Sequence, residues 1–256
     1  MKTLFYNQTA YISDLDLNGD SDKTLFLVHG AGLSKGLWER QLGAFPGLAA
    51  TIAIDLPGHG ESRNPAKKNI TEYADAVMDL VRHTGARQPV LCGLSMGGAV
   101  CLDLLIRYPE FFVAGILMHT GAKLTVNRLL FDTLKKGIEE HLDMIAAFAV
   151  SPKSDSKKMK PLIRDISVLS VETATGDFTA CNTFDRMGDL SAVKVPVLVV
   201  TGSDDLITPG KYGAYLVEHI SDSRLFIIKD AGHLSPLERP EAVNEVISGF
   251  LTEISG

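Results

Sequence analysis

The sequence predicts an α/β protein with a mostly parallel sheet, helices on both faces of that sheet, and one inserted helical segment. Three observations lead to this prediction. Short apolar runs alternate along the chain with longer amphipathic patterns, most of the runs are rich in Val, Ile and Leu, and one long stretch after the middle lacks strand candidates. Strands that helices cover on both faces have this nearly continuous apolar character.

Six apolar runs are candidates for buried strands, and two shorter ones near the N-terminus are candidates for an antiparallel edge. Their lengths and their content of Val and Ile fit strands better than helices. The buried candidates are residues 24–28, 51–54, 90–92, 113–118, 197–201 and 224–228, and the edge candidates are 4–6 and 10–12.

Helix signals fall between these runs. Residues 70–83 follow Asn69, a good N-cap, and stop before Gly85, while Pro109 ends a helix predicted over 96–108. A last helix over about 240–254 has its apolar residues on one face. From 122 to 190 there are only helical patterns, such as 127–148, with a polar stretch at 151–160 interpreted as a loop. We therefore expect a core of residues 1–121 and 191–256 and a helical cap at 122–190.

Composition sets the broad class. The chain has 256 residues, of which 45% are hydrophobic and 22% charged, as in a globular protein, and its net charge of −6 does not favour nucleic acid or an anionic membrane as a partner. Residues 1–22 are acidic and lack the apolar run of a signal peptide, so we expect a cytoplasmic location. The cysteines form no C-x-x-C pair, and Cys92 is expected to be a small buried hydrophobe.

The pentapeptide Gly-Leu-Ser-Met-Gly at 93–97 has the G-x-S-x-G pattern and lies between a predicted strand and a predicted helix. In that setting the serine occupies a sharp turn that exposes its hydroxyl, and glycine neighbours let strand and helix pack closely. The pattern predicts Ser95 as a nucleophile. The first amide of the following helix, that of Met96, is predicted to face an anion formed at this point.

A serine nucleophile requires a histidine base and a carboxylate that orients the base. The strand predicted at 197–201 is followed by an acidic loop with Asp204 and Asp205, and the strand at 224–228 is followed by His233. The carboxyl ends of parallel strands meet at one edge of a sheet, so Ser95, one of the two aspartates and His233 are expected to converge there. The chain order of serine, acid and histidine is consistent with this.

Four motifs in this order resemble those of the α/β-hydrolase superfamily. They are His-Gly-Ala-Gly at 29–32, Asp-Leu-Pro-Gly-His-Gly-Glu-Ser at 55–62, the pentapeptide around Ser95, and Ala-Gly-His at 231–233. The resemblance covers most of the chain outside the predicted cap. It implies an α/β-hydrolase fold and a serine hydrolase that works through an acyl-enzyme without a cofactor.

The resemblance also assigns individual residues. The family's acid loop reads G-x-x-D-x-x-x-P, and Gly202 and Pro209 place that acid at Asp205, which leaves Asp204 as a solvated turn residue. The family pattern puts one oxyanion-hole amide on the residue after His-Gly, which is Ala31; the other is expected from Met96. The implied catalytic residues are Ser95, Asp205 and His233.

Three further histidines have weaker interpretations. His119 follows a predicted strand, so it either lines the substrate pocket or is a structural histidine with satisfied hydrogen bonds. His29 and His59 show no metal-ligand spacing and are expected to brace loops. The glycine-rich stretches lack the lysine of a P-loop and the spacing of a dinucleotide site. No metal or cofactor is therefore expected.

The expected function is hydrolysis of a carboxylic ester of a small molecule. Serine rather than aspartate at position 95 disfavours the haloalkane dehalogenase and epoxide hydrolase branches. A lactonase, a cofactor-free carbon–carbon bond hydrolase and a perhydrolase stay open on the same triad, and the run at 91–98 resembles that of the enol-lactonases. A small-molecule receptor with the same fold is the alternative from another class. The sequence does not specify an oligomeric state.

Overall fold

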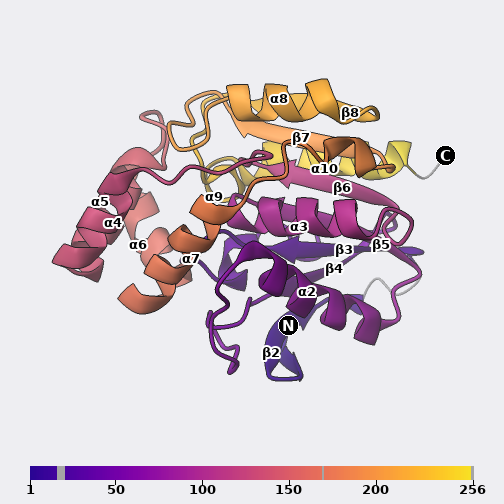
Figure 1. The fold of residues 1–256 in the computed structure, drawn as a ribbon, viewed down its shortest axis with the longest axis horizontal. Coiled ribbons are helices and arrows are strands. Elements are labelled where there is room, and N and C mark those ends of the chain that lie inside the picture. Colours follow the sequence, from indigo (N-terminus) through magenta and orange to yellow (C-terminus); the bar gives the residue numbers. More distant parts are fainter. Residues whose placement is uncertain (16–20, 169, 255–256) are drawn as a thin grey trace.

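An eight-stranded sheet forms the centre of the computed structural model, which describes residues 1–15, 21–168 and 170–254 (Figure 1). Its strand order is β1-β2-β4-β3-β5-β6-β7-β8. β1 and β2 are antiparallel, β2 is antiparallel to β4, and all other neighbours are parallel. The strands are β1 (Thr3–Tyr6), β2 (Thr9–Ser13), β3 (Lys23–Val28), β4 (Ala50–Ile54), β5 (Gln88–Leu94), β6 (Ala114–Met118), β7 (Val197–Gly202) and β8 (Ser223–Ile228). The mostly parallel sheet and its antiparallel edge are confirmed.

Helices cover both faces of this sheet. On one face α2 (Ile70–Thr84), α3 (Met96–Arg107) and α8 (Lys211–His219) pack in a cluster with Phe26, Leu91 and Leu117. On the other face a 3-10 turn, η1 (Lys35–Trp38), and α10 (Pro240–Glu253) pack in a second cluster with Leu25, Cys92 and Ile116. A short helix, α9 (Ser235–Glu238), precedes α10. The predicted α/β layering is confirmed, although α8 and α9 were not predicted.

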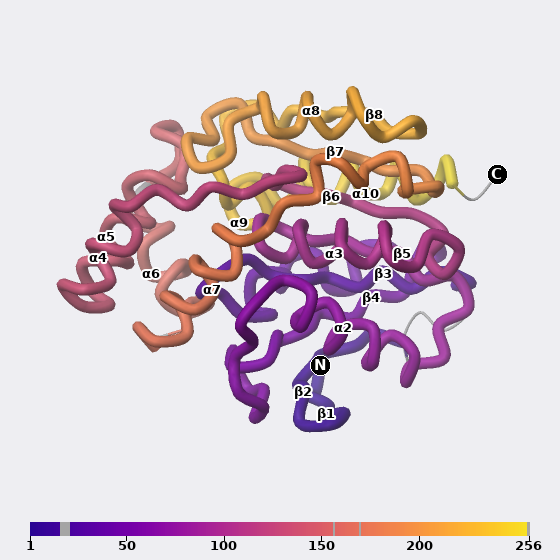
Figure 2. Tube along the Cα trace, in the orientation of Figure 1, coloured from indigo at the N-terminus to yellow at the C-terminus, as the bar shows by residue number. Residues whose placement is uncertain are grey.

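Four helices lie between β6 and β7, at the end of the sheet where the parallel strands finish (Figures 1 and 2). They are α4 (Arg128–Lys136), α5 (Ile138–Phe148), α6 (Ser156–Ile166) and α7 (Val171–Thr183), and a 3-10 turn, η2 (Leu190–Ala192), follows them. The helical pattern at 127–148 is divided at Gly137, whose φ of +121° interrupts the helix. Part of the predicted loop at 151–160 is helical, because the Asp155 side chain accepts a hydrogen bond from the Lys157 amide and caps α6.

Two further features concern the burial of the cysteines and the length of the helices. Cys92, Cys101 and Cys181 are buried and unpaired, and burial raises the pKa of the Cys92 thiol, so Cys92 packs as a small apolar residue as predicted. Among the described residues, no helix combines the length and the apolar character that crossing a membrane requires.

Candidate active site

Ser95 occupies a strained turn between β5 and α3. Its φ of +56° and ψ of −115° lie outside the regions that non-glycine residues favour. The turn is this tight because α3 packs directly against strand backbone: a Cβ on Gly97 would lie 2.2 Å from the carbonyl oxygen of Val28, and one on Gly93 would lie 2.1 Å from that of Gly97. The glycines of the pentapeptide are therefore required by packing, as the motif predicts.

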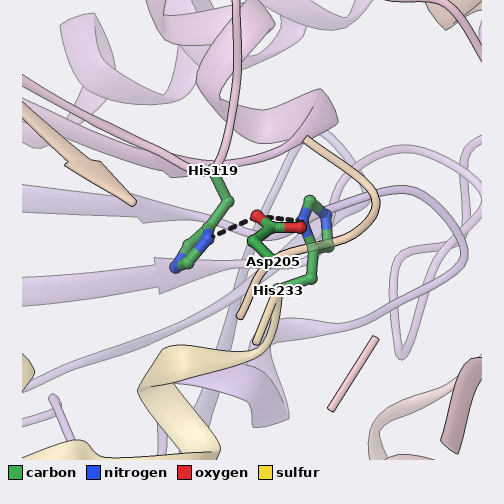
Figure 3. A group of neighbouring side chains, drawn as sticks. All are labelled: His119, Asp205 and His233. Atoms are coloured by element: carbon green, nitrogen blue, oxygen red, sulfur yellow. Dashed lines mark hydrogen bonds and ion pairs between the residues drawn. The ribbon is translucent and has the colours of Figure 1, made fainter. Parts of the chain in front are cut away.

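The loops after β7 and β8 bring Asp205 and His233 together (Figure 3). Nδ1 of His233 lies 3.0 Å from Oδ2 and 3.2 Å from Oδ1 of Asp205. Asp204 instead accepts a hydrogen bond from the Ser151 hydroxyl at 2.5 Å, on the segment between α5 and α6. The structure therefore places Asp205, and not Asp204, where an acid could orient the imidazole.

The Asp205 carboxylate is held by donors on both oxygens. Oδ1 accepts from the amides of Ile207 and Thr208, each at 2.9 Å, and Oδ2 accepts from the Thr208 hydroxyl at 2.8 Å. Burial would raise the pKa of Asp205, but attraction to His233 and hydrogen bonds from His119 and His233 outweigh it and lower the pKa. Asp205 is therefore a charged and oriented carboxylate. Thr208 was not singled out from the sequence.

His119 lies behind Asp205. Its side chain is fully buried, with Nδ1 2.8 Å from Asp205 Oδ2 and Nε2 2.7 Å from the Ser235 hydroxyl. Burial lowers the pKa of His119, so the neutral ring donates through Nδ1 and accepts from Ser235 through Nε2. His119 is not among the described residues that line the cavities beside Ser95. Of the two interpretations of His119, the structural histidine with satisfied hydrogen bonds fits its position. Its hydrogen bond also helps to hold the Asp205 carboxylate.

The cluster of His119, Asp205 and His233 has the composition of a metal site, since one ligand atom from each lies within 4.8 Å of the others. The nitrogen–oxygen distances of 2.8 and 3.0 Å are hydrogen-bond lengths, which require protons on the two Nδ1 atoms. Nitrogens that carry protons cannot bind a metal, and the amides of Ile207 and Thr208 already occupy the carboxylate. We therefore interpret the cluster as a hydrogen-bonded unit.

Ser95 and His233 line the same cavity, which we call the inner cavity. It measures about 70 Å³ as the space open to the centre of a water molecule. Within the described structure no hydrogen bond joins the two side chains, and such contacts between nucleophile and base often form only in the substrate complex. Its apolar wall comes from the β3–η1 loop and the inserted helices, with Leu33, Leu130, Leu142, Ile145, Ala174 and Phe178.

Ser95 also borders a second and larger space, which we call the outer groove. It measures about 430 Å³ on the same basis and shares Ala31, Leu130, Phe178 and Ile207 with the inner cavity. Ser95 thus lies between two spaces that could hold the two arms of a substrate. The outer groove is defined further by Leu124, Val126, Leu129, Phe148, Leu206 and Tyr212.

Two backbone amides near Ser95 are without a hydrogen-bond partner in the described structure, those of Ala31 and Met96. Met96 is the first residue of α3, where an amide has no acceptor within the helix. Ala31 borders both the inner cavity and the outer groove. These are the two donors that the sequence and the resemblance pointed to.

A buried carboxylate on α7 holds the loop that contains Ala31. Asp177 accepts hydrogen bonds from the Gly32 amide at 2.8 Å, from Nε2 of His59 at 2.7 Å and from the Tyr73 hydroxyl at 2.7 Å. Nδ1 of His59 donates to the Pro57 carbonyl at 2.9 Å, so both ring nitrogens act as donors and the ring is an imidazolium. His59 and Asp177 form a buried ion pair. Asp177 was not identified from the sequence.

His29 braces the same region as a neutral ring. Nδ1 donates to the Gly30 carbonyl at 2.8 Å, and Nε2 accepts from the Leu56 amide at 3.0 Å. Burial, and then the nearby charge of His59, lowers the pKa of His29 to about 3. Both histidines therefore brace loops, as predicted.

A second buried carboxylate, that of Glu238, holds the loop of His233. It accepts from the Gly232 amide at 2.9 Å and from the Ser151 amide at 2.7 Å, and so joins this loop to the segment between α5 and α6. The His233 amide donates to the Ala149 carbonyl of the same segment at 2.7 Å. The inserted helices therefore support the positions of both His233 and Ala31.

The sheet order, the strained serine turn and the histidine paired with an acid after β7 and β8 are together those of an α/β hydrolase. The sequence profile of the Alpha/beta hydrolase family matches residues 25–246, and the chain belongs to this family.

Curated relatives and solved structures agree with this assignment. The chain is similar to 3-oxoadipate enol-lactonase 2 of Acinetobacter baylyi (27% identity, 98% of each chain covered) and to a pimeloyl-[acyl-carrier protein] methyl ester esterase of Neisseria meningitidis (28% identity, 91% of this chain and 94% of the relative). It is similar in structure to a thermophilic esterase (TM-score 0.84, 29% identity, 99% and 97% covered). An enol-lactonase from Burkholderia xenovorans, at 24% identity, shares the fold (TM-score 0.84, 98% and 100% covered).

Replacing Asp205 should affect turnover far more than replacing Asp204. We expect Asp205→Asn to lower kcat by about 10³- to 10⁴-fold, because the imidazole loses the carboxylate that fixes its tautomer. Asp204→Asn removes only one charge at the Ser151 contact and should stay within about fivefold of wild type. Steady-state kinetics on an aryl ester, with circular dichroism of both variants, checks this. The opposite ranking would overturn the assignment of the acid.

The ion pair of His59 and Asp177 should make stability depend on pH. Burial lowers the pKa of His59, but the hydrogen bond and attraction to Asp177 outweigh it and raise the pKa. Its stabilisation is then complete below the unfolded value of 6.5 and is lost as pH rises through the folded pKa. Wild type should be more stable than His59→Gln by about 3 kcal/mol at low pH, with a smaller difference at high pH.

Urea unfolding of wild type and His59→Gln between pH 5.5 and pH 9 measures this difference. His83→Gln, which changes an exposed histidine on α2 that stacks on Tyr6, is the control, and any difference in stability from wild type should stay the same across this pH range. A difference for His59→Gln that is constant or grows with pH would contradict a charged pair.

Proposed function

We propose that the protein is a serine hydrolase that cleaves a carboxylic ester of a small molecule through an acyl-enzyme intermediate. One observation carries the proposal: Ser95 and His233 line one cavity, and the Asp205 carboxylate is hydrogen-bonded to Nδ1 of His233. The neutral imidazole then presents Nε2 as a base toward the cavity, because its Nδ1 proton is directed to the carboxylate.

In the first half-reaction, Nε2 of His233 takes the proton of Ser95 as Oγ attacks the ester carbonyl. Asp205 stabilises the imidazolium that forms, and the imidazolium then protonates the leaving alcohol. In the second half-reaction His233 activates water, which attacks the acyl-Ser95 ester and releases the acid. Each step uses only groups that border the inner cavity or contact those groups.

The amides of Ala31 and Met96 stabilise the oxyanion in both half-reactions. Both are unpaired in the described structure, and Met96 adds the positive end of α3. A preorganised donor of this kind contributes about 2.7 to 4 kcal/mol in other enzymes. Asp177 supports this function by fixing the Gly32 amide beside Ala31.

A lactonase is the second candidate function, favoured by similarity to two enol-lactonases of Acinetobacter baylyi over 97–98% of the chain. A lactone is a cyclic ester, so the same residues would open it without another catalytic group. The two functions differ in the alcohol, which stays attached to the acyl group when a lactone opens.

A panel of aryl esters, thioesters and lactones tests the proposal with wild type and Ser95→Ala. Wild type should turn over several small esters, and Ser95→Ala should lose about 10⁶-fold in kcat because no other group supplies the nucleophile. Full activity in Ser95→Ala would contradict the role of Ser95. The relative rates on esters and lactones decide between the two candidate functions.

The same panel separates an enzyme from a hydrolase-like receptor. A receptor would release one equivalent of product and then stay acylated or stop. Sustained turnover over many equivalents, followed by mass spectrometry of Ser95, would exclude that alternative.

A further inference from the structure

Among the described residues, the inner cavity contains two polar side chains that the proposed mechanism does not use, and the hydrogen bonds of the protein account fully for only one of them. Four polar side chains of the described residues border it: Ser95, His233, Ser167 and His141. The first two have catalytic roles, and the Ser167 hydroxyl donates to the Ile163 carbonyl at 2.6 Å. His141, on α5, has no role in the proposed mechanism. The residue is only 6% exposed.

The hydrogen bonds of Thr133 determine which nitrogen of His141 carries the proton. The Thr133 hydroxyl lies 3.0 Å from the Leu130 carbonyl, which can only accept, and 3.0 Å from Nδ1 of His141. Since the single hydroxyl proton goes to Leu130, Nδ1 must be the donor to Thr133. Burial lowers the pKa of His141 to about 4, so near neutral pH the ring has one proton and Nε2 has a free lone pair.

The Thr133 hydroxyl contacts Nδ1 of His141, and the Leu130 backbone also interacts with the ring and raises its pKa against the effect of burial. Nε2 makes no hydrogen bond of ordinary length to a described residue, and it is not among the fully buried side-chain atoms that lack a partner. His141 borders the inner cavity, so a molecule inside the cavity can approach its ring. The surrounding wall is apolar: Leu130, Leu142 and Phe178 line it, and the Phe178 ring packs 5.6 Å from that of His141. A buried acceptor in an apolar wall is stabilised only when a donor reaches it.

We propose that His141 is a specificity-determining residue that selects esters whose inner arm is short, uncharged and carries a hydrogen-bond donor, such as a hydroxyl, for Nε2. The proposal rests on the proposed ester hydrolysis at Ser95. A carboxylate arm does not fit, because it would face another acceptor and no described residue lining the cavity carries a cation.

The size of the cavity limits the arm. A volume of about 70 Å³ holds roughly five to seven water-sized positions, which corresponds to an arm of that many heavy atoms. His141 lies in the helical wall and Ser95 at the end of the sheet, so the donor and the ester carbonyl belong to different parts of the arm. The other arm of the ester extends into the outer groove.

The test compares esters that differ only at the end of one arm. Aryl esters of five- and six-carbon acids are prepared with a terminal hydroxyl, a methyl group or a carboxylate. A second series, acetates of the matching alcohols, places the same groups on the alcohol side. For each series the selectivity ratio is kcat/KM for the hydroxyl ester divided by kcat/KM for the methyl ester.

His141→Phe keeps an aromatic ring but removes the acceptor, so the ratio should fall about tenfold in the series whose arm enters the inner cavity. His141→Gln supplies an amide oxygen and should restore part of the ratio. His219→Phe, which changes an exposed histidine on α8, is the matched control and should leave the ratio unchanged. The carboxylate esters should be the poorest substrates of wild type.

The outcomes separate the two proposals. If methyl-terminated esters are hydrolysed but both His141 variants keep the wild-type ratio in both series, the role of His141 is wrong and the proposed function stands. If wild type hydrolyses none of the esters, the proposed function fails, and this inference fails with it. If His141→Phe does not fold, His141→Leu, which also lacks an acceptor, replaces it: a ratio equal to that of wild type in both series would contradict the role of His141.

Discussion

The close approach of α3 to the backbone of β3 and β5 is the constraint on which the rest of the site depends. A side chain on Gly97 would meet the Val28 carbonyl at 2.2 Å, so helix and strand can pack at this separation only without a Cβ between them. The chain must then turn within one residue, which forces Ser95 to a φ of +56°. The cost of such a backbone is of order 1–3 kcal/mol, and the buried sheet and helix supply it. In the part of the chain that the structure describes, the same turn leaves the Met96 amide without an acceptor.

The inserted helices border the proposed site, and they also hold the loops that contain Ala31 and His233 in place. Asp177 of α7 fixes the Gly32 amide, and Glu238 joins the Gly232 amide to Ser151 between α5 and α6. In each case a buried carboxylate bridges a core loop and the insertion through backbone amides. Charge-assisted hydrogen bonds of this kind are stronger than neutral ones. Motion of the insertion against the core would therefore disturb the loops of Ala31 and His233, which couples the shape of the inner cavity to the geometry of the proposed site.

Sequence reasoning could place a residue when that residue directly follows a buried strand, because the strand then determines its position in the fold. Ser95 and His233 each follow a buried strand, and parallel strands finish at one edge, so their convergence could be predicted without knowing any long-range contact. The choice of Asp205 over Asp204 needed the family resemblance, because adjacent aspartates in one loop look alike locally. In the structure the two aspartates differ in their partners: Asp204 accepts a hydrogen bond from Ser151 of the insertion, and Asp205 contacts His233. His119 shows the limit of the strand-end rule, which predicts the edge of the sheet but not the direction of a side chain.

Most of the residues that sequence reasoning missed have partners that are distant in the chain; Thr208, three residues from Asp205, is an exception. Asp177 and Gly32 are separated by 145 residues, and Glu238 and Ser151 by 87. No local pattern predicts such pairs, since an aspartate on an amphipathic helix is normally solvated. The signal that identifies them is physical: a buried carboxylate must have donors. The same rule applied to acceptors leads from the satisfied side chains of the inner cavity to His141.

Ser95 lies between the inner cavity and the outer groove, and the walls of these spaces determine how the protein can distinguish one ester from another. Apolar walls discriminate weakly, since one methylene group in a hydrophobic pocket changes binding by only about 1–3 kcal/mol. A buried acceptor without a partner discriminates more strongly, because the wrong substrate leaves it unpaired. The similar proteins include an enol-lactonase and a pimeloyl-[acyl-carrier protein] methyl ester esterase, so the resemblance that points to the proposed catalytic residues does not by itself specify the substrate. Among the described residues that line the inner cavity, His141 has an acceptor that the proposed mechanism does not use, held in one tautomer by Thr133, and this acceptor can separate one ester from another.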